Sequence, residues 1–332
     1  MRPPARDETP CNLCGAANWV VVGTRDRDGR SLRTVLCRFC GLVWINPRPS
    51  IADMNAYYRT EYRADYKGQT APPLRKIVRG FLGAADRRQL LRRLLRSHAN
   101  GTPAIDRSRK PTMVDVGCGA GELVYLMRRD GVDASGLEPG IEYSEFARRV
   151  LGVPMQTAAV DTAVVPSASQ DVVTMFHALE HVPDPRTVLT TIRGWLVVGG
   201  HLVIEVPNIA ARVQAPAHRF HYAHLYHFTG ATLGALGEVA GLRLVETRYS
   251  EDGGNVVCVF RRADDTERPA AGLEQDAART LAAITSHTSV RHYLTRVPYA
   301  RTAGRLKGHL SENRLLRQLT TVDAVVRWAT TL

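Results

Sequence analysis

The pattern of apolar and polar positions is most regular between residues 111 and 262. Short apolar runs there alternate with stretches in which apolar residues recur every three or four positions. The runs predict strands and the recurrence predicts helices, and such alternation is typical of a parallel sheet covered on both faces. In chain order we expect strand 112–116, helix 122–130, strand 133–138, helix 141–150, strand 171–176, helix 185–197, strand 201–206 and a hairpin of strands 242–249 and 255–261.

Both flanks of this region read as helical. Leu74 to His98 combines an apolar stripe with many arginines, and Ser50 is placed as the N-cap of an earlier helix. Tyr58, Tyr62 and Tyr66 would share one face of that earlier helix. Near the other end, an apolar stripe fits docking or dimerisation, and it consists of Leu315, Leu319, Val322 and Val326.

Composition and charge narrow the class of protein. The 332 residues are 44% hydrophobic and 23% charged, which suits a globular protein with a sizeable core. The longest apolar run, Trp195 to Val206, is interrupted by Gly199 and Gly200 and is too short to span a membrane. With no apolar leader at the start, we expect a cytoplasmic protein.

The net charge of +12 is concentrated in residues 74–110 and in the stretch from Arg291 onward. These segments could bind a phosphate-bearing substrate, an anionic membrane or RNA, or they could simply be solvated helix faces. The sequence leaves these alternatives open.

Two Cys-x-x-Cys-Gly motifs lie near the start, Cys11 with Cys14 and Cys37 with Cys40. Two residues between thiolates allow both sulfurs of each motif to reach one tetrahedral ion, and a second motif completes a four-thiolate zinc site. Such a closed site supplies folding energy and leaves no coordination position for catalysis. We therefore predict a structural Zn²⁺ ion in an N-terminal ribbon.

A glycine-rich loop, Gly117-Cys118-Gly119-Ala120-Gly121, follows the first predicted strand and opens a helix. Its G-x-G-x-G spacing differs from that of the dinucleotide-binding fingerprint, but the glycines still allow the backbone to approach a ligand. The next strand ends in Glu138 and Pro139, which places a carboxylate where ribose hydroxyls would lie. A nucleoside ligand is expected.

Together, Val114 to Glu122, Gly136 to Pro139 and Asp171 to Pro185 resemble the class I S-adenosylmethionine-dependent methyltransferases. The resemblance implies an α/β, Rossmann-like seven-stranded sheet with an antiparallel last hairpin. It assigns the cofactor site to Asp115, Gly117, Cys118, Gly119, Gly121, Glu138, Pro139, Phe176 and His177.

The paired cysteine motifs add a second resemblance, to bacterial sugar and natural-product methyltransferases with an N-terminal four-Cys zinc domain. Where the C-methylating members carry a His-Glu-His triplet, this chain has Tyr222-Ala223-His224. We therefore divide the chain into a zinc ribbon (1–50), a helical basic linker or lid (51–110), a cofactor-binding methyltransferase domain (111–262) and a helical C-terminal extension (263–332).

Four histidines recur at intervals of three after the fourth predicted strand, at positions 218, 221, 224 and 227. Imidazole is suited to take the proton of an attacking hydroxyl. His224 is the leading general base and His177 the second candidate. A catalytic metal held by His177, Glu180 and His181 is the alternative reading, and we expect a hydrogen-bond network there instead.

These features predict methyl transfer from S-adenosylmethionine to a hydroxyl rather than a carbon of a sugar or related small metabolite, which a nucleotide or lipid could carry. The alternative is an RNA methyltransferase that grips nucleic acid with its ribbon and basic helices. Phe81 is the single aromatic residue of the arginine-rich stretch, residues 74–110, whereas readers of single strands typically present several rings to stack on bases. A small-molecule partner is therefore expected in place of nucleic acid, with peripheral membrane contact and a homodimer left open.

Overall fold

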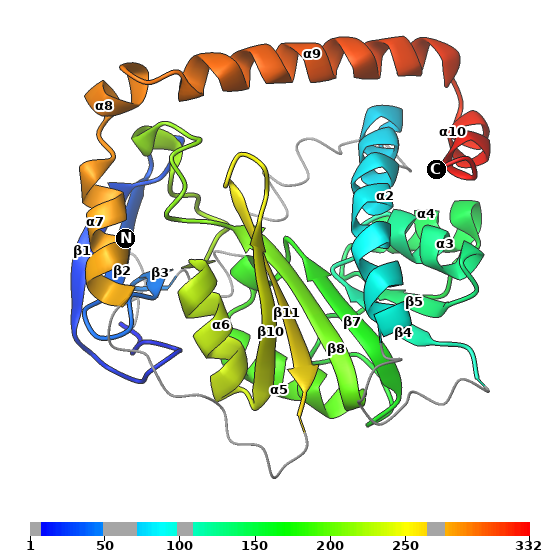
Figure 1. Ribbon diagram of the computed structural model, residues 1–332, viewed down its shortest axis with the longest axis horizontal. Coiled ribbons are helices and arrows are strands. Elements are labelled where there is room, and N and C mark those ends of the chain that lie inside the picture. The colour runs from blue at the N-terminus through cyan, green and yellow to red at the C-terminus, as the bar shows by residue number, and fades with distance from the viewer. Residues whose placement is uncertain (1–7, 49–71, 98–108, 264–275) are drawn as a thin grey trace, which may run out of the picture.

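The computed structural model describes residues 8–48, 72–97, 109–263 and 276–332. Ser50 and the three tyrosines at positions 58, 62 and 66 lie outside these residues. Within them, the chain forms two sheets flanked by helices, and a long helix crosses above the larger sheet (Figure 1).

The larger sheet has seven strands in the order β10-β11-β8-β7-β4-β5-β6. The pairs from β8 to β6 are parallel, and β11 runs antiparallel to both β8 and β10. This confirms the expected Rossmann-like sheet with an antiparallel last hairpin. The strands are β4 (Thr112–Val116), β5 (Asp133–Leu137), β6 (Met155–Gln156), β7 (Gln170–Phe176), β8 (Leu196–Pro207), β10 (Leu242–Tyr249) and β11 (Asn255–Arg262).

Three of the helices between these strands were expected from the sequence pattern, and the fourth, α6, was not. The helices are α3 (Glu122–Arg129), α4 (Ile141–Phe146), α5 (Pro185–Trp195) and α6 (Gly230–Val239). Two of them end earlier than the pattern predicts: α4 gives way to a π-helical turn, Ala147–Leu151, and α5 stops because Leu196 already pairs with β7. Short 3₁₀ turns, Leu179–His181 and Pro216–His218, lie near the carboxyl ends of β7 and β8.

Strand order reverses at β4. The chain continues from β4 to β5 and β6 on one side and then returns to place β7 and β8 on the other. In open α/β sheets, the crevice at the carboxyl ends of the strands beside such a reversal is where ligands bind. The loop after β4 and the ends of β5 and β7 therefore define the place to look for a site.

The smaller sheet joins the N-terminal ribbon to the rest of the molecule. Its order is β1-β2-β3-β9, with β1 (Trp19–Arg25), β2 (Ser31–Cys37) and β3 (Val43–Ile45) from the ribbon. The fourth strand, β9 (Tyr226–His227), belongs to the loop after β8 and pairs antiparallel with β3. A segment of the methyltransferase region thus completes the sheet of the ribbon.

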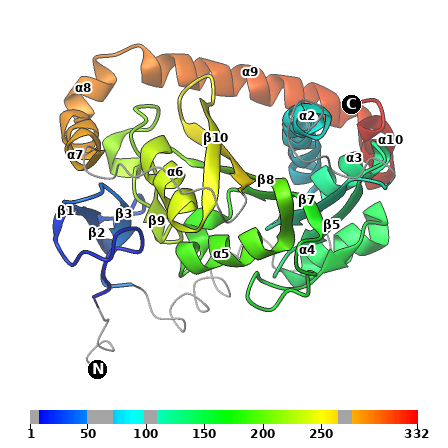
Figure 2. The same cartoon turned by 60° about the horizontal axis from the view of Figure 1, so that its bottom comes forward.

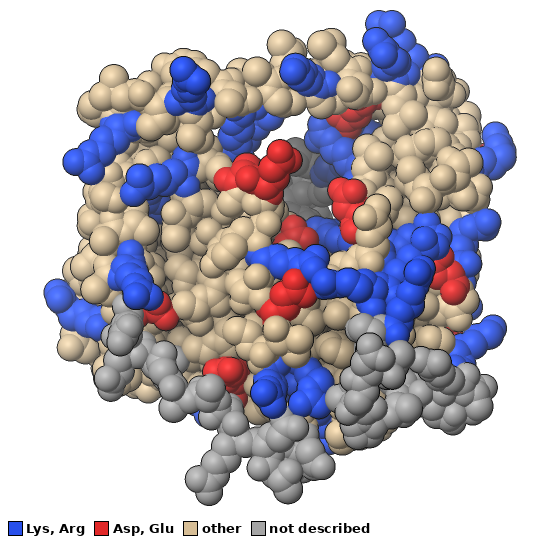
Figure 3. All heavy atoms as spheres, in the orientation of Figure 1, with Lys and Arg blue, Asp and Glu red and all other residues tan. Residues whose placement is uncertain are grey.

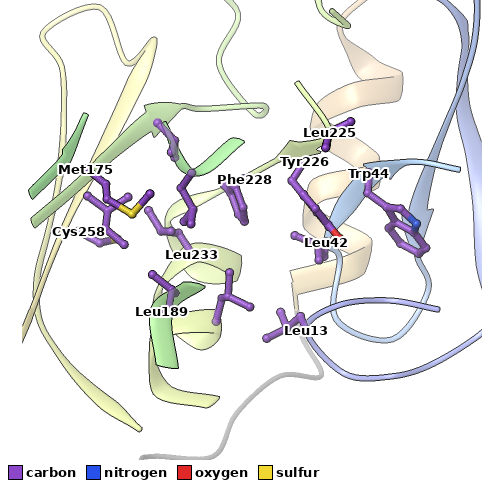
Figure 4. Packing of buried hydrophobic residues seen from close by; sticks show 14 of the residues in the cluster. Leu13, Leu42, Trp44, Met175, Leu189, Leu225, Tyr226, Phe228, Leu233 and Cys258 are labelled. Atoms are coloured by element: carbon purple, nitrogen blue, oxygen red, sulfur yellow. The ribbon is translucent and has the colours of Figure 1, made fainter. Parts of the chain in front are cut away.

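One apolar core continues across this junction. Trp44 of β3, Tyr226 of β9 and the neighbouring Phe228 are fully buried. Figure 4 shows these side chains beside Leu42 on one side and, on the other, a group from α6 and the large sheet that includes Leu233. A contact at the start of α5 adds to the junction, because Asn12 of the first cysteine motif donates to Asp184 and accepts from the backbone N–H of Arg186.

The arginine-rich helix α2 (Leu74–Ser97) packs against α3, and most of its cations have acidic partners. Arg88 and Arg92 both donate to Asp130, and although burial alone would raise the pKa of this carboxyl, the two guanidinium groups lower it to about 2. The remaining pairs of the helix are Arg75 and Arg79 with Glu312, Arg87 with Glu205, and Arg93 with Glu246. The charge of this helix is largely used within the fold.

The C-terminal region is helical, as expected, with α7 (Asp276–Ser286), α8 (Ser289–Tyr293), α9 (Val297–Gln318) and α10 (Val322–Ala329). The predicted apolar stripe spans the junction of α9 and α10. Leu319 is buried, and the other members of the stripe pack against the core beside α2. The stripe therefore docks within the chain.

Candidate active site

The loop after β4 has the backbone geometry of a ligand-binding turn. Gly117, Gly119 and Gly121 have φ values of 69°, 57° and 83°, a region that side chains other than glycine rarely occupy. The backbone N–H groups of Gly117 and Cys118 donate to the carbonyl of Leu137, which holds the loop against the end of β5. Apart from the chain neighbours of Gly119, no atom of the described residues lies within 4 Å of the position that a Cβ on Gly119 would take, so the loop faces open space there.

Glu138 fixes the neighbouring wall of this space. Its carboxylate accepts from the backbone N–H groups of Gly119, at 3.0 Å, and Gly140, at 2.7 Å. Burial raises the pKa of Glu138, and these two hydrogen bonds oppose the rise. Pro139 follows directly, so the carboxylate lies between the glycine loop and the start of α4.

Two further carboxyl groups are buried beside the loop. Asp115 accepts a 2.6 Å hydrogen bond from Thr174 of β7, and burial, only partly offset by this bond, raises its pKa to about 6. Glu122 begins α3, and burial raises its pKa to about 8. The three acids create a site that favours a cationic ligand, because a nearby positive charge would lower all three pKa values.

At the end of β7, Phe176 and His177 approach this space from the other side. The guanidinium of Arg87 lies 4.3 Å from the centroid of the Phe176 ring and donates to Glu205 of β8. Glu205 also contacts His177 Nε2 at 3.1 Å. Burial alone would lower the pKa of His177, but Glu180 and Glu205 outweigh it and raise the pKa to about 9.

Three of the four predicted histidines form a group with His181, and His224 lies at its centre. The ring centroid of His224 lies 4.9 Å from that of His181, 5.0 Å from that of His221 and 6.0 Å from that of His227. Burial and the neighbouring imidazoles hold the pKa of His224 well below its usual value. His224 is therefore neutral at neutral pH and has a lone pair available to accept a proton.

His218 does not join this group. It ends an exposed 3₁₀ turn. Histidines three residues apart come together only in the part of the loop between His221 and β9.

Glu180 and His181 extend the group toward β7. Glu180 is 1% exposed, and its Oε2 has no hydrogen-bond partner among the described residues. Its Oε1 lies 3.6 Å from His177 Nδ1 and 3.9 Å from His181 Nε2. Ligand atoms of Glu180, His181 and His224 lie within 4.8 Å of one another, a grouping that could hold a metal ion. The geometry thus includes His224 in place of the His177 that the sequence suggested as third ligand.

The four cysteines of the ribbon converge on one point. Their sulfur atoms lie within 4.8 Å of one another, with Cys11 and Cys40 at 3.4 Å and Cys14 and Cys37 at 3.5 Å. The glycines after the two motifs, Gly15 and Gly41, have φ values of 76° and 78° and turn the backbone around the sulfurs. Four thiol sulfurs at this separation form a group that could hold a metal ion.

Sequence reasoning missed two residues of the candidate site, Arg87 and Glu205. Glu205 interrupts the apolar run of β8 near its carboxyl end, and a lone acid in a buried strand was the available signal. Arg87 gave no comparable signal because it is one of many arginines on α2.

Comparison with known proteins agrees with this geometry. Residues 84–247 match the family model of a methyltransferase domain. The chain therefore carries a methyltransferase domain, and its large sheet has the class I methyltransferase fold.

Curated relatives match over part of this chain. The ubiquinone biosynthesis O-methyltransferase of Photorhabdus laumondii is 36% identical over 103 residues, which cover 29% of this chain and 42% of that protein. The protein of the same name from Cronobacter sakazakii is 37% identical over 106 residues, which cover 30% of this chain and 44% of that protein. The chain thus spans less than half the length of these relatives.

Solved structures give more distant matches. A complex of the Haloferax volcanii Trm112 methyltransferase activator with a putative methyltransferase matches with a TM-score of 0.41 and 18% identity, over 47% of this chain and 84% of that one. A putative S-adenosylmethionine-dependent methyltransferase from Listeria monocytogenes matches with a TM-score of 0.41 and 13% identity, over 52% of this chain and 98% of that one.

The environment of His177 yields a prediction about its charge. Because Glu180 and Glu205 raise its pKa to about 9, His177 should remain protonated through neutral pH. Glu205→Gln removes one of the two carboxylates and should lower this pKa. An NMR titration of the imidazole signals measures the change, with Glu251→Gln in the exposed hairpin turn as the control. A His177 signal that titrates at its usual pKa in the unaltered protein would contradict the arrangement.

Proposed function

We propose that this chain transfers a methyl group from S-adenosylmethionine to a hydroxyl group of a small metabolite. The observation that carries the proposal is the glycine loop at the strand-order reversal, with the buried Asp115 beside it and the half-buried Glu138 accepting from the backbone N–H of Gly119. S-adenosylmethionine has a sulfonium and an ammonium group against one carboxylate, so its net positive charge suits these acids. When bound, this cofactor supplies an electrophilic methyl group.

The proposed contacts follow the order of the strands. Asp115 and the glycine loop, including Cys118, would hold the amino-acid part of the cofactor. Glu138 and Pro139 would lie at the ribose, with Phe176 and His177 at the methionine end. Because His177 is cationic at neutral pH, its role in this scheme is to fix Glu180 and Glu205, and the general base is sought elsewhere.

His224 is the residue we propose as the general base. Bound S-adenosylmethionine would supply its methyl group to the hydroxyl oxygen of the acceptor, and its sulfur would leave as a neutral thioether that keeps the electron pair of the broken carbon–sulfur bond. The hydroxyl proton passes to the neutral imidazole of His224. The depressed pKa makes this imidazole a weak base, which suits a proton that becomes acidic only as the new bond forms. Alignment of the two reacting atoms would then supply much of the rate.

Support for a hydroxyl acceptor comes from the curated relatives, which are named O-methyltransferases. A sugar or related metabolite, free or carried by a nucleotide or lipid, remains our proposed acceptor class. RNA is disfavoured because the arginines of α2 that would grip a phosphate backbone are paired with Glu205, Asp130, Glu246 and Glu312. Incubation of the protein and labelled cofactor with pooled sugars, lipid-linked glycans, phenols and RNA tests the acceptor class directly.

We further propose that the cysteines hold a structural Zn²⁺ ion. One zinc ion per chain is expected by elemental analysis, and Cys14→Ser should lose it, with Cys258→Ser as the control because that thiol lies in the large sheet. Since β9 pairs with β3, loss of the ion should also lower methyl transfer by displacing the segment that carries His224. Zinc-free protein that retains a folded ribbon would contradict this role.

The cofactor assignment predicts two effects on binding. Glu138→Ala should weaken S-adenosylmethionine binding roughly 10- to 100-fold, since a hydrogen bond to a charged acceptor contributes about 1.5–3 kcal/mol. Affinity should also fall as the pH is lowered through about 6, because protonated Asp115 can no longer attract the cationic ligand.

Calorimetry at several pH values measures both effects, with Glu142→Ala on the exposed start of α4 as the matched control. Equal affinity in Glu138→Ala and the unaltered protein would refute the assignment of the ribose site.

The base assignment predicts that His224→Ala lowers kcat about 10²- to 10⁴-fold while leaving S-adenosylmethionine affinity near normal. Steady-state rates at saturating cofactor test this, with His218→Ala as the control because His218 lies outside the imidazole group. Unchanged turnover in His224→Ala would exclude the role.

A chelator separates proton transfer from metal catalysis. If EDTA abolishes turnover and Mg²⁺ or Mn²⁺ restores it, the group of Glu180, His181 and His224 acts as a metal site and the general-base role is wrong.

A further inference from the structure

Large exposed apolar side chains lie on α8, on Leu294 directly after it, and on α9. The exposed fractions are 71% for Val290, 81% for Leu294, 63% for Tyr299, and 60% for both Leu306 and Leu310. We call these five residues the outer apolar stripe. Single exposed apolar residues are ordinary on a protein surface, but a contiguous series marks an interaction site.

The middle of α9 contacts little of the protein. Every residue from 302 to 311 is exposed, although all belong to one continuous helix. The helix is held at its two ends: Arg301 donates to the carbonyl of Val213, and Glu312 accepts from Arg75 and Arg79 of α2. Figures 1 and 2 show α9 crossing above the large sheet between these anchors, and Figure 3 shows an opening beneath it.

The helical spacing turns the stripe outward. At about 100° per residue, Tyr299, Leu306 and Leu310 fall within about 40° of one another. The anchors Arg301 and Glu312 share a face roughly opposite to theirs. The apolar side chains of α9 therefore point away from the body of the molecule.

Basic side chains flank the stripe on the same outward side. Arg296, Lys307, Arg314 and Arg317 all lie within about 80° of its centre on α9 and are exposed. Glu312 is the only acid between residues 289 and 318, and it is buried against α2. This surface thus combines exposed aliphatic and aromatic groups with positive charge.

We propose that the outer apolar stripe and its flanking cations bind the surface of an anionic lipid bilayer. Apolar side chains enter the boundary of headgroups and acyl chains, while Lys and Arg attract acidic lipids. A second copy of the chain is a poorer occupant because pairing two such faces would bring like charges together. RNA would use the cations but would leave Leu294, Leu306 and Leu310 without a role. No helix of the described residues is long and apolar enough to span a membrane, so the contact is with the surface.

The position of α9 gives this contact a consequence for the acceptor. The helix crosses the side of the sheet at which the candidate active site opens (Figure 1). Docking through the outward face would hold that opening close to the lipid headgroups. An acceptor carried on a lipid could then reach the site. This statement about the acceptor rests on the proposed function, whereas the docking of α9 to a bilayer is independent of it.

Co-sedimentation with vesicles tests the docking without any measure of methyl transfer. The full chain should pellet with vesicles of phosphatidylcholine and phosphatidylglycerol but not with phosphatidylcholine alone, and binding should weaken as salt is raised. The double variant Leu306→Ser and Leu310→Ser should bind at least about tenfold more weakly. Val164→Ser is the matched control, since Val164 is 80% exposed on a different loop.

Further measurements test the contribution of the cations and the oligomeric state of the protein. Lys307→Gln with Arg314→Gln should also weaken binding at least about tenfold, and circular dichroism should show that each variant keeps its helices. Equal binding to neutral and anionic vesicles, or full binding by Leu306→Ser with Leu310→Ser, would overturn the proposal. A third result would also overturn it: no vesicle binding, together with a dimer, seen by light scattering, that Leu306→Ser with Leu310→Ser dissociates. The stripe would then be an interface between two copies of the chain.

Discussion

The pairing of β9 with β3 is the constraint on which the candidate site depends. Only two residues, Tyr226 and His227, form the strand, yet they attach the loop after β8 to the cysteine ribbon. The flanking Leu225 accepts from the backbone N–H of Ile45, and Trp44 is buried beside the pair. A two-residue strand is not stable alone, so its position is set by the ribbon. Leu225 alone separates His224 from this strand, so the ribbon also fixes the position of His224.

The electrostatics of the site follow from burial more than from ion pairing. Burial penalises the charged forms of Asp115, Glu122 and Glu138 and so raises their pKa values. At Glu205, the nearby His177 and Arg87 outweigh the effect of burial and lower the pKa of the carboxyl to about 2. Two kinds of acid thus lie around the same space. Those with raised pKa values favour a cationic ligand, and Glu205 fixes its neighbours. At His224, burial and the neighbouring imidazoles lower the pKa, so this ring stays neutral.

Local patterns in the sequence were sufficient for the sheet, the glycine loop and the cysteine group, since each depends on spacing along the chain. Residues that meet only through tertiary structure were harder. The interval of three marked four histidines alike, but it did not indicate that His218 is exposed or that the segment pairs with β3. The arginines of α2 could have formed a binding face or a solvated face. Their spacing does not indicate that they pair with residues as distant in sequence as Glu205 and Glu312.

His177 shows how tertiary contacts can hold a residue in a backbone conformation that residues other than glycine rarely adopt. Its φ is 55°, in the left-handed region, where a residue other than glycine costs of order 1–3 kcal/mol. Glycine would avoid this cost but would remove the imidazole. The backbone N–H of His177 donates to the carbonyl of Glu205 at 2.8 Å, and the side chain contacts the carboxylates of Glu180 and Glu205. These contacts offset the backbone strain, and they do so only with a side chain present. The strained position is therefore a consequence of the charge network, which places a cationic imidazole between the buried Glu180 and the half-buried Glu205.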